Sequence, residues 1–436
     1  MSEAAAVLPR ETEVVVIGGG IVGCSTAYFL AEAGVPVALF EKGRIAGEQS
    51  SRNWGWVRKQ GRDPLELPAI IESLRIWQDL EARLGADLGW HQGGVTYLAR
   101  SDEEVAKFEA WLEHARAYQL DTRLLSSAET DVLLGQDQRR WKAALFTPSD
   151  GRAEPSKAAP AIAAAAERLG AQVLPGCAVR TVETAAGRVS GVVTERGAVA
   201  CRAVVCAAGV WTSRFSRNLG IDLPQLGVKA SVLRTKPAPL ITQSAVDAGT
   251  VAFRRRQDGG YSIARGSAHV FELVPDAFRY LKPFWPAHRR AGKEQRIRLT
   301  GAFLRELMRP SRWSGDQPTV FETDRVIDPK PEQATLDLAL ADAKRLFPQL
   351  ANIKVAETWA GIIETTPDQL PVMAAVERPA GFLLASGFSG HGFGIGPGAG
   401  LLMAELVRQG RARVDLTPFR LERFSDGSPI RIYAGP

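Results

Sequence analysis

Six residues near the N-terminus, Gly18-Gly19-Gly20-Ile21-Val22-Gly23, place glycines at GxGxxG spacing between two segments of different periodicity. The run Glu13 to Ile17 before them is short and β-branched, which predicts a buried parallel strand. Ile21 to Gly34 has helical spacing and stops at glycine, and Val37 to Glu41 predicts a second buried strand. The segment is therefore predicted to form one βαβ unit, and an acidic residue closes its second strand, which is typical of dinucleotide binding.

Each part of this motif has a physical reason. Gly18 permits the tight turn, Gly20 lets backbone approach a pyrophosphate, and Gly23 allows close packing of the helix against the strand. The unpaired N–H groups at the start of the helix point at the pyrophosphate. Glu41 is expected to accept hydrogen bonds from the adenosine ribose hydroxyls.

The loop after the second strand, Lys42 to Arg52, favours FAD over NAD. It places basic and hydroxyl groups, among them Lys42, Arg44, Ser50 and Ser51, where they would contact phosphates and adenosine. A plain NAD enzyme would rarely need such a loop.

Three separated blocks resemble the D-amino-acid-oxidase-like family of FAD-dependent amine and amino-acid oxidoreductases, which includes glycine oxidase, sarcosine oxidase and D-amino-acid dehydrogenase. The first is the N-terminal unit through Ser51. The second is Ala203 to Trp211 (AVVCAAGVW), and the third joins a WAG, a TPD and the run GFSGHGFGIGP between Trp359 and Pro397. A helix from about Pro397 to Arg408 would direct its N-terminus toward the flavin N1/O2 edge, where negative charge develops on reduction.

The resemblance implies an α/β fold in which a Rossmann-like, glutathione-reductase-type FAD-binding domain carries an inserted α+β substrate domain on a mostly antiparallel sheet. A chain of 436 residues has room for about two or three domains, and it contains no repeat or Gly/Ser linker. We expect residues 1–90, 150–222 and 352–436 to form the FAD-binding domain, and residues 91–149 and 223–351, with a basic insertion at 275–313, to form the substrate domain.

Helical spacing and β-type runs predict further elements. Helices are expected at Leu65–Leu84, Glu103–Tyr118, Pro155–Leu169 and Gln333–Phe347, and strands at Val95–Leu98, Val189–Val193 and Val204–Cys206.

Further cofactor contacts are implied by the resemblance. The expected set comprises Gly18, Gly20, Ile21, Val22, Gly23, Glu41, Lys42, Arg44, Ser50, Ser51, Gly55, Val179, Ala207, Ala208, Gly209, Trp211, Gly361, Gly390, His391 and Gly392. The flavin is expected to be noncovalent, because no cysteine follows Cys206 and no histidine occurs in the 44–60 loop. The four cysteines have no metal-ligand spacing, so no metal is expected.

Many family members carry an arginine in the WxGxRPxTPD block that binds the substrate carboxylate, and here Ile363 replaces it. Either no carboxylate is bound or another arginine binds it. The chain is also similar to the bacterial L-amino-acid deaminases, at KGRIAGEQSSR, at Phe253-Arg254 with Asp258 to Tyr261, and at Tyr280 to Pro283. In those enzymes an arginine shortly after the tyrosine holds the carboxylate, and Arg265 is the nearest match, one residue closer to Tyr261 than the pattern suggests.

Three other residues are candidate site residues. Trp56 and His391 align with positions that line the substrate pocket in that subfamily, although the residue types differ. Glu364 lies between apolar Ile363 and Thr365 at the expected flavin edge. Its carboxylate would either attract a substrate ammonium or pair with a structural arginine.

The net charge of +6 has a local origin, because between Pro275 and Trp313 ten Lys/Arg residues stand against three acidic ones. In the L-amino-acid deaminases the corresponding segment is associated with membrane contact and electron delivery. Here Phe303, Leu304, Leu307 and Met308 form an apolar stripe at helical spacing, consistent with peripheral contact with anionic lipid or with a core or subunit interface. No run is long enough to span a membrane and no signal peptide is visible, so we expect a cytoplasmic location, peripheral at the inner membrane face if the stripe binds lipid.

The sequence therefore predicts oxidative deamination: hydride passes from the amine-bearing carbon to flavin N5, and the imine hydrolyses to a keto acid or aldehyde. An L-amino-acid deaminase-like activity fits best, with a secondary-amine, D-amino-acid or polyamine oxidase or dehydrogenase as the alternative. Oxygen or a quinone would be the acceptor, and the oligomeric state stays open. A tRNA-modifying flavoenzyme or a non-catalytic flavin-binding subunit are rivals, but basic charge confined to one block argues against nucleic acid.

Overall fold

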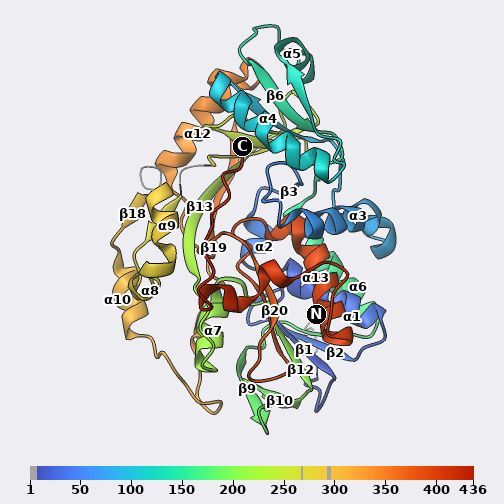
Figure 1. Ribbon diagram of the computed structural model, residues 1–436, viewed down its shortest axis with the longest axis vertical. Helices are drawn as coiled ribbons and strands as arrows, with labels where there is room; N and C mark the ends of the chain where they lie inside the picture. The colour runs from blue at the N-terminus through green and yellow to red at the C-terminus, as the bar shows by residue number, and fades with distance from the viewer. Residues whose placement is uncertain (1–6, 267–268, 292–295) are drawn as a thin grey trace.

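The computed structural model describes residues 7–266, 269–291 and 296–436, and two large sheets organise the chain (Figure 1). One is six-stranded, in the order β20-β21-β12-β1-β2-β8, and is parallel except where β20 runs antiparallel to β21. Its central strand is apolar and fully buried, as expected for a strand covered on both faces. The strands are β1 (Val14–Ile17), β2 (Val37–Phe40), β8 (Gln172–Leu174), β12 (Ala203–Cys206), β20 (Val372–Ala375) and β21 (Phe382–Ser386).

Two helices from opposite ends of the chain pack together on this sheet, α1 (Ile21–Glu32) and α13 (Gly392–Gln409). A Cβ on Gly400 would lie 2.4 Å from the Cβ of Ser25, so glycine is what permits the close approach. The predicted start of α13 at Pro397 is wrong by five residues. Gly394, Gly396 and Gly398 are helical because each packs tightly against a neighbouring segment, and this contact overrides their low helix propensity.

The second sheet is mixed. Its strand order is β18-β17-β13-β16-β15-β14-β4-β6-β5, with β19 along the other edge of β13. Most pairs are antiparallel, but β4 with β14 and β17 with β18 are parallel. The strands are β4 (Val95–Ala99), β5 (Arg123–Ser126), β6 (Ala143–Thr147), β13 (Leu226–Thr235), β14 (Ala245–Asp247), β15 (Ala252–Arg255), β16 (Tyr261–Ala264), β17 (Val270–Glu272), β18 (Arg296–Arg298) and β19 (Val355–Thr365).

The predicted helices and strands are present with small shifts at their ends. The corresponding elements are α3 (Leu67–Leu84), α4 (Asp102–Ala117), α6 (Pro155–Arg168), α12 (Gln333–Leu346), β4, β10 (Arg188–Thr194) and β12. The other described elements are α2 (Gln49–Arg52), β3 (Trp56–Val57), α5 (Ser127–Leu134), β7 (Gly151–Arg152), β9 (Val179–Ala185), β11 (Gly197–Ala200), α7 (Thr212–Asn218) and α11 (Val320–Thr323).

The basic segment forms α8 (Pro275–Arg279), α9 (Leu281–Ala291), β18 and α10 (Gly301–Met308), which lie together at the left of Figure 1. Lys293 and Glu294 of this segment lie outside the described residues. The apolar stripe on α10 faces solvent: Leu304, Leu307 and Met308 are 61%, 60% and 78% exposed.

Candidate active site

A cavity of about 900 Å³ begins at the carboxyl ends of β1, β2 and β12 and extends to β19 and the start of α13. Ligands bind at this edge of open parallel sheets. The lining residues come from segments far apart in sequence. Of the residues expected to bind the cofactor, the cavity is lined by Gly18, Gly20, Ile21, Val22, Glu41, Lys42, Ser50, Val179, Ala207, Ala208, Gly209, Trp211, Gly361, Gly390, His391 and Gly392.

The glycine turn requires glycine at two positions for steric reasons. Gly18 has φ +109°, and a Cβ there would lie 2.4 Å from the carbonyl oxygen of Ala207. A Cβ on Gly23 would lie 1.9 Å from the carbonyl oxygen of Gly18. The backbone N–H of Ile21 donates to Ser50 Oγ at 2.9 Å, which ties the start of α1 to the loop after β2. The turn thus opens a helix N-terminus onto the cavity, as a pyrophosphate needs.

Glu41 lies at the end of β2 and lines the same part of the cavity. Its carboxylate accepts one hydrogen bond from the N–H of Gly19 and one from the N–H of Gly43, both at 2.7 Å. Burial raises its pKa, and the two backbone donors oppose that shift. A carboxylate fixed in this way retains lone pairs for ribose hydroxyls, so the residues present fit the adenosine end of FAD.

Lys42 is engaged differently from the phosphate contact that the loop composition predicted. Its ammonium donates to Glu48 Oε1 at 2.7 Å and to the carbonyls of Asp324 and Arg325 at 2.7 and 2.9 Å. These three bonds use all its donors. Lys42 therefore joins the cofactor loop to the segment after α11.

Four other expected contacts lie outside the cavity lining: Gly23, Arg44, Ser51 and Gly55. Gly23 acts through packing, as described above. Arg44 is exposed, and Ser51 Oγ donates to the carbonyl of Glu48 at 3.3 Å. Gly55 packs against the guanidinium of Arg254, which donates to both carboxylate oxygens of Glu154 at 2.8 and 3.0 Å.

Glu364 lines the cavity from β19 and is 4% exposed. Its carboxyl accepts from the N–H groups of Gly387 and Phe388 at 3.2 and 3.3 Å and from Gln225 Nε2 at 3.4 Å. Burial raises its pKa to about 7. No arginine is among its partners in the described part of the chain, so the pairing with a structural arginine is not seen.

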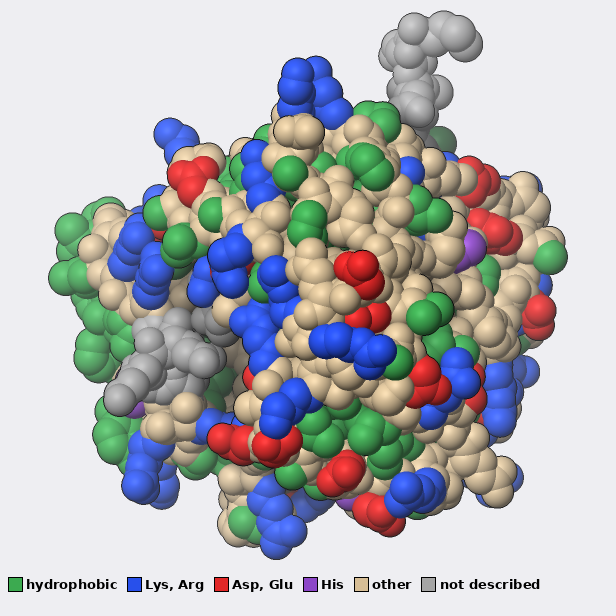
Figure 2. Space-filling model, turned by 90° about the horizontal axis from the view of Figure 1, so that it is seen from above, with side chains coloured by type: hydrophobic (Ala, Val, Ile, Leu, Met, Phe, Trp, Pro, Cys, Tyr) green, Lys and Arg blue, Asp and Glu red, His purple; other side chains and the backbone are tan. Residues whose placement is uncertain are grey.

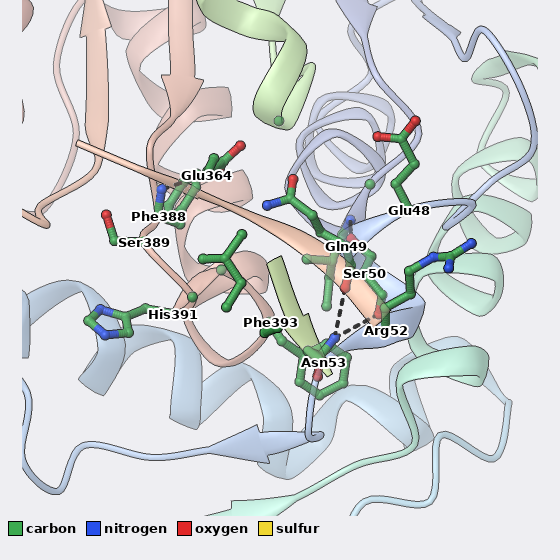
Figure 3. Close-up of a pocket in the computed structure, with 18 of the residues that line it drawn as sticks. Glu48, Gln49, Ser50, Arg52, Asn53, Glu364, Phe388, Ser389, His391 and Phe393 are labelled. Atoms are coloured by element: carbon green, nitrogen blue, oxygen red, sulfur yellow. Dashed lines mark hydrogen bonds between the residues drawn. The ribbon is translucent and has the colours of Figure 1, made fainter. Parts of the chain in front are cut away.

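Figure 3 shows Glu364, Phe388 and His391 on one side of the cavity and the residues of α2 on the other. His391 Nδ1 lies 3.1 Å from Glu66 Oε2. Burial lowers the pKa of His391 to about 4, so the imidazole is neutral at neutral pH. Trp56 is 8% exposed, and among the described residues its indole N–H has no hydrogen-bond partner.

Arg265 is not brought into the site. Its guanidinium donates to Asp342 of α12 at 3.2 Å, and it is absent from the described residues that line the cavity. Arg58 and Arg62, which sequence analysis missed, line the cavity instead, with Tyr97 and Asp247. The signal available was the polar run Arg58 to Asp63 (RKQGRD) between two apolar segments, which resembles a solvated loop.

The part of the cavity beyond the glycine turn is mostly apolar and aromatic, with Trp54, Trp56, Ile362, Ile363, Phe388 and Phe393 in its walls. A dinucleotide site that continues into such a chamber, with a second glycine-rich helix start beside it, defines a flavin-dependent oxidoreductase. The chain belongs to the DAO family of FAD dependent oxidoreductases, whose family model matches residues 13–406.

Known proteins are similar over nearly the whole chain. The structure of an L-amino acid deaminase from Proteus myxofaciens, in complex with anthranilate, is 30% identical, covers 97% of this chain and 96% of that one, and has a TM-score of 0.92. Glycine oxidase from Bacillus subtilis is 27% identical over 95% of this chain and 98% of its own length. Mouse mitochondrial sarcosine dehydrogenase is 26% identical over 96% of this chain, which spans only 42% of that protein.

Within the described ranges, no helix is long and apolar enough to cross a membrane. The same residues contain no group of three or more His, Cys, Asp or Glu side chains that could hold a metal ion. The four cysteines are free and buried.

Proposed function

We propose that this protein uses noncovalent FAD to oxidise the amine-bearing carbon of an amino acid, with an L-amino acid as the preferred substrate. The observation that carries the proposal is the single cavity that joins the glycine turn to an aromatic chamber large enough for a small substrate. The similarity to the Proteus myxofaciens deaminase, with a TM-score of 0.92, supports the L-amino acid.

The residues divide the work between the two ends of the cavity. The turn at Gly18 and Gly20 and the carboxylate of Glu41 would hold the adenosine diphosphate end. Bound FAD supplies the acceptor for a hydride from the amine-bearing carbon. The chamber walls exclude water during transfer, and the N-terminus of α13, which starts at Gly392, favours negative charge nearby.

Acid–base assistance is not required of the side chains. Hydride transfer needs the amine in its neutral form, which forms when the substrate ammonium loses its proton to solvent, and His391 is itself neutral because burial lowers its pKa to about 4. The imine product hydrolyses with water after release, and the second half-reaction uses oxygen or a quinone. The noncovalent attachment is supported by the described lining of the cavity, which includes no cysteine.

The test is anaerobic reduction of the bound flavin by a panel of L- and D-amino acids, N-methyl amino acids and polyamines. We expect L-amino acids to bleach the visible absorbance and to yield the keto acid and ammonia on turnover. If only N-methyl amino acids or only polyamines bleach the flavin, the proposal of an L-amino acid substrate is wrong and the compounds that bleach it define the substrate class. A fully loaded flavin that none of the panel bleaches would refute amine oxidation.

We further propose that the basic segment contacts a membrane surface. Phe278, Leu281, Trp285 and Leu299 are each more than half exposed, beside the exposed stripe of α10. Hydrophobic side chains gather with Lys and Arg at the left edge of Figure 2, on the side where Figure 1 places α8 to α10. Exposed apolar area next to basic charge suits anionic lipid.

Sedimentation with vesicles tests this proposal. We expect binding to vesicles containing phosphatidylserine and little binding to neutral phosphatidylcholine vesicles. Replacing Leu304, Leu307 and Met308 with serine should release the protein, while the flavin content stays unchanged. Failure of the unaltered protein to sediment with anionic vesicles would refute it.

A further inference from the structure

Arg58 and Arg62 lie in the loop between β3 and α3, and both side chains line the cavity. The other basic residues on its inner walls already have partners. Lys42 is bound by Glu48 and two carbonyls, and Arg52 donates to Asp328 and to the carbonyl of Ala360. The two loop arginines are therefore the cations to consider as ligands for a negatively charged substrate group.

Arg62 is buried, and the carboxyl groups of Glu66 and Asp150 lie near enough to oppose the fall in its pKa that burial causes, without pairing with it directly. It is 4% exposed, its Nε donates to the carbonyl of Arg58 at a long 3.4 Å, and its Nη1 has no hydrogen-bond partner among the described residues. No ion pair joins it to a carboxylate in the described part of the chain, since the nearby Glu66 is hydrogen-bonded to His391. Burial, followed by repulsion from Arg58, lowers the pKa of Arg62 to about 9. A buried cation with an unused donor is costly unless a ligand completes it.

Arg58 adds a second positive charge beside the first. Its guanidinium lies over the ring of Tyr97, 5.5 Å from the centroid, and it donates to the carbonyl of Gln60. It too makes no direct ion pair among residues the structure describes, although Asp247 lines the same cavity, where burial raises the pKa of its carboxyl and the charge of Arg58 opposes that rise. Gly61, at φ +69°, brings these groups together, because a Cβ there would lie 3.2 Å from both Arg58 Nη1 and the Tyr97 hydroxyl.

The loop that carries both arginines is held rigidly. The fully buried carboxylate of Asp150 accepts from the N–H groups of Lys59 and Gln60 at 2.9 and 3.0 Å. Trp111 Nε1 donates to the carbonyl of Arg62 at 3.1 Å, and Thr147 Oγ1 donates to Gln60 Oε1 at 2.8 Å. Hydrogen bonds that fix a loop in this way are typical of a pre-organised binding site and unusual for a solvated loop.

We propose that Arg62, assisted by Arg58, binds the carboxylate of the substrate and takes the place of the arginine that Ile363 replaces. The substrate class is then amino acids that carry a free carboxylate, and simple amines are excluded. This inference rests on the proposed function, because it names the substrate group that the same cavity recognises.

The test measures ligand binding separately from turnover. Flavin-loaded wild-type, Arg62→Met, Arg58→Met and Arg265→Met proteins are titrated with anthranilate and with 2-aminobenzamide, which replaces the carboxylate by a neutral amide, and the flavin spectrum reports binding. Arg265→Met is the matched control, since Arg265 pairs with Asp342 outside the cavity. We expect Arg62→Met to weaken anthranilate binding about 10- to 100-fold, the usual range for a charge-assisted hydrogen bond. Arg58→Met should have a smaller effect, and no variant should change binding of the amide.

Other outcomes overturn the inference. These are anthranilate binding by Arg62→Met at wild-type strength, a loss of anthranilate binding in Arg265→Met instead, or a wild-type protein that does not bind anthranilate. If Arg62→Met loses its flavin, Arg62→Lys replaces it in the test, because lysine keeps the charge but not the planar guanidinium. Arg62→Lys should bind anthranilate with intermediate affinity. Wild-type affinity in Arg62→Lys would contradict the inference. Equal flavin reduction by amino acids and carboxylate-free amines would refute the subsite but leave amine oxidation standing. Anthranilate binding that depends on Arg62, without flavin reduction by any amine, would refute amine oxidation but leave the carboxylate subsite standing.

Discussion

The raised pKa of Glu364 makes stability depend on pH in a defined direction. This carboxyl is nearly fully buried, and burial raises its pKa from the ordinary value of 4.5 to about 7. The folded state therefore holds a proton that the unfolded state has already released. Because the folded state binds more protons between these two values, the contribution of Glu364 to stability falls as pH rises through this window.

The magnitude follows from the size of the shift. Between pH 5 and pH 8 the carboxyl should reduce the free energy of unfolding by about 2 to 3 kcal/mol. Glu364→Gln removes this dependence because the amide does not titrate. The variant should thus match the wild type near pH 5 and be about 2 to 3 kcal/mol more stable at pH 8.

Urea unfolding of flavin-free protein at several pH values provides the measurement. Glu357→Gln is the matched control on the exposed part of the same strand, where Glu357 pairs with Arg234, and its effect should stay within about 1 kcal/mol at every pH. A Glu364→Gln difference that is constant from pH 5 to pH 8, or one that shrinks as pH rises, would show that the carboxyl is not held protonated by burial.

Two further predictions concern packing and ion pairing. Gly23→Ala forces a Cβ against the carbonyl oxygen of Gly18, so its FAD affinity should fall at least about tenfold. The control Gly301→Ala places its Cβ in open space and should leave flavin content unchanged. Equal FAD affinity of the two variants in a titration would contradict this prediction. Arg254→Met removes both charged hydrogen bonds of the buried Glu154 carboxylate and leaves it the longer 3.8 Å ion pair with Arg256. The change should cost about 3 kcal/mol in urea unfolding, against at most about 1 kcal/mol for the control Arg234→Met, and similar losses in the two variants would refute the assignment.

The βαβ unit and the family were predictable from the sequence because their signals are local. The GxGxxG spacing, the acidic end of β2 and the glycine run before α13 each lie within one short segment, and the family model and the structural neighbours confirm the fold class. The residue boundaries of the two domains stay a prediction.

The errors concern contacts between distant residues. Arg265 resembled a carboxylate ligand because it follows Tyr261, but its partner Asp342 lies 77 residues further on. Lys42 lines the cavity as expected, but the carbonyls of Asp324 and Arg325 that its ammonium binds are more than 280 residues away, and its contact with the cofactor stays a prediction. Arg58 and Arg62 were missed because the contacts of their loop with Trp111 of α4 and with Asp150 form only in the fold.

The packing of α1 against α13 has a consequence for synthesis of the chain on the ribosome. The turn that would bind the pyrophosphate is translated long before α13, the helix against which α1 packs. Strands β20 and β21 of the same sheet are equally late. A nascent chain therefore cannot assemble the complete cavity until α13 has emerged from the ribosome, so cofactor retention would report that synthesis has passed this helix.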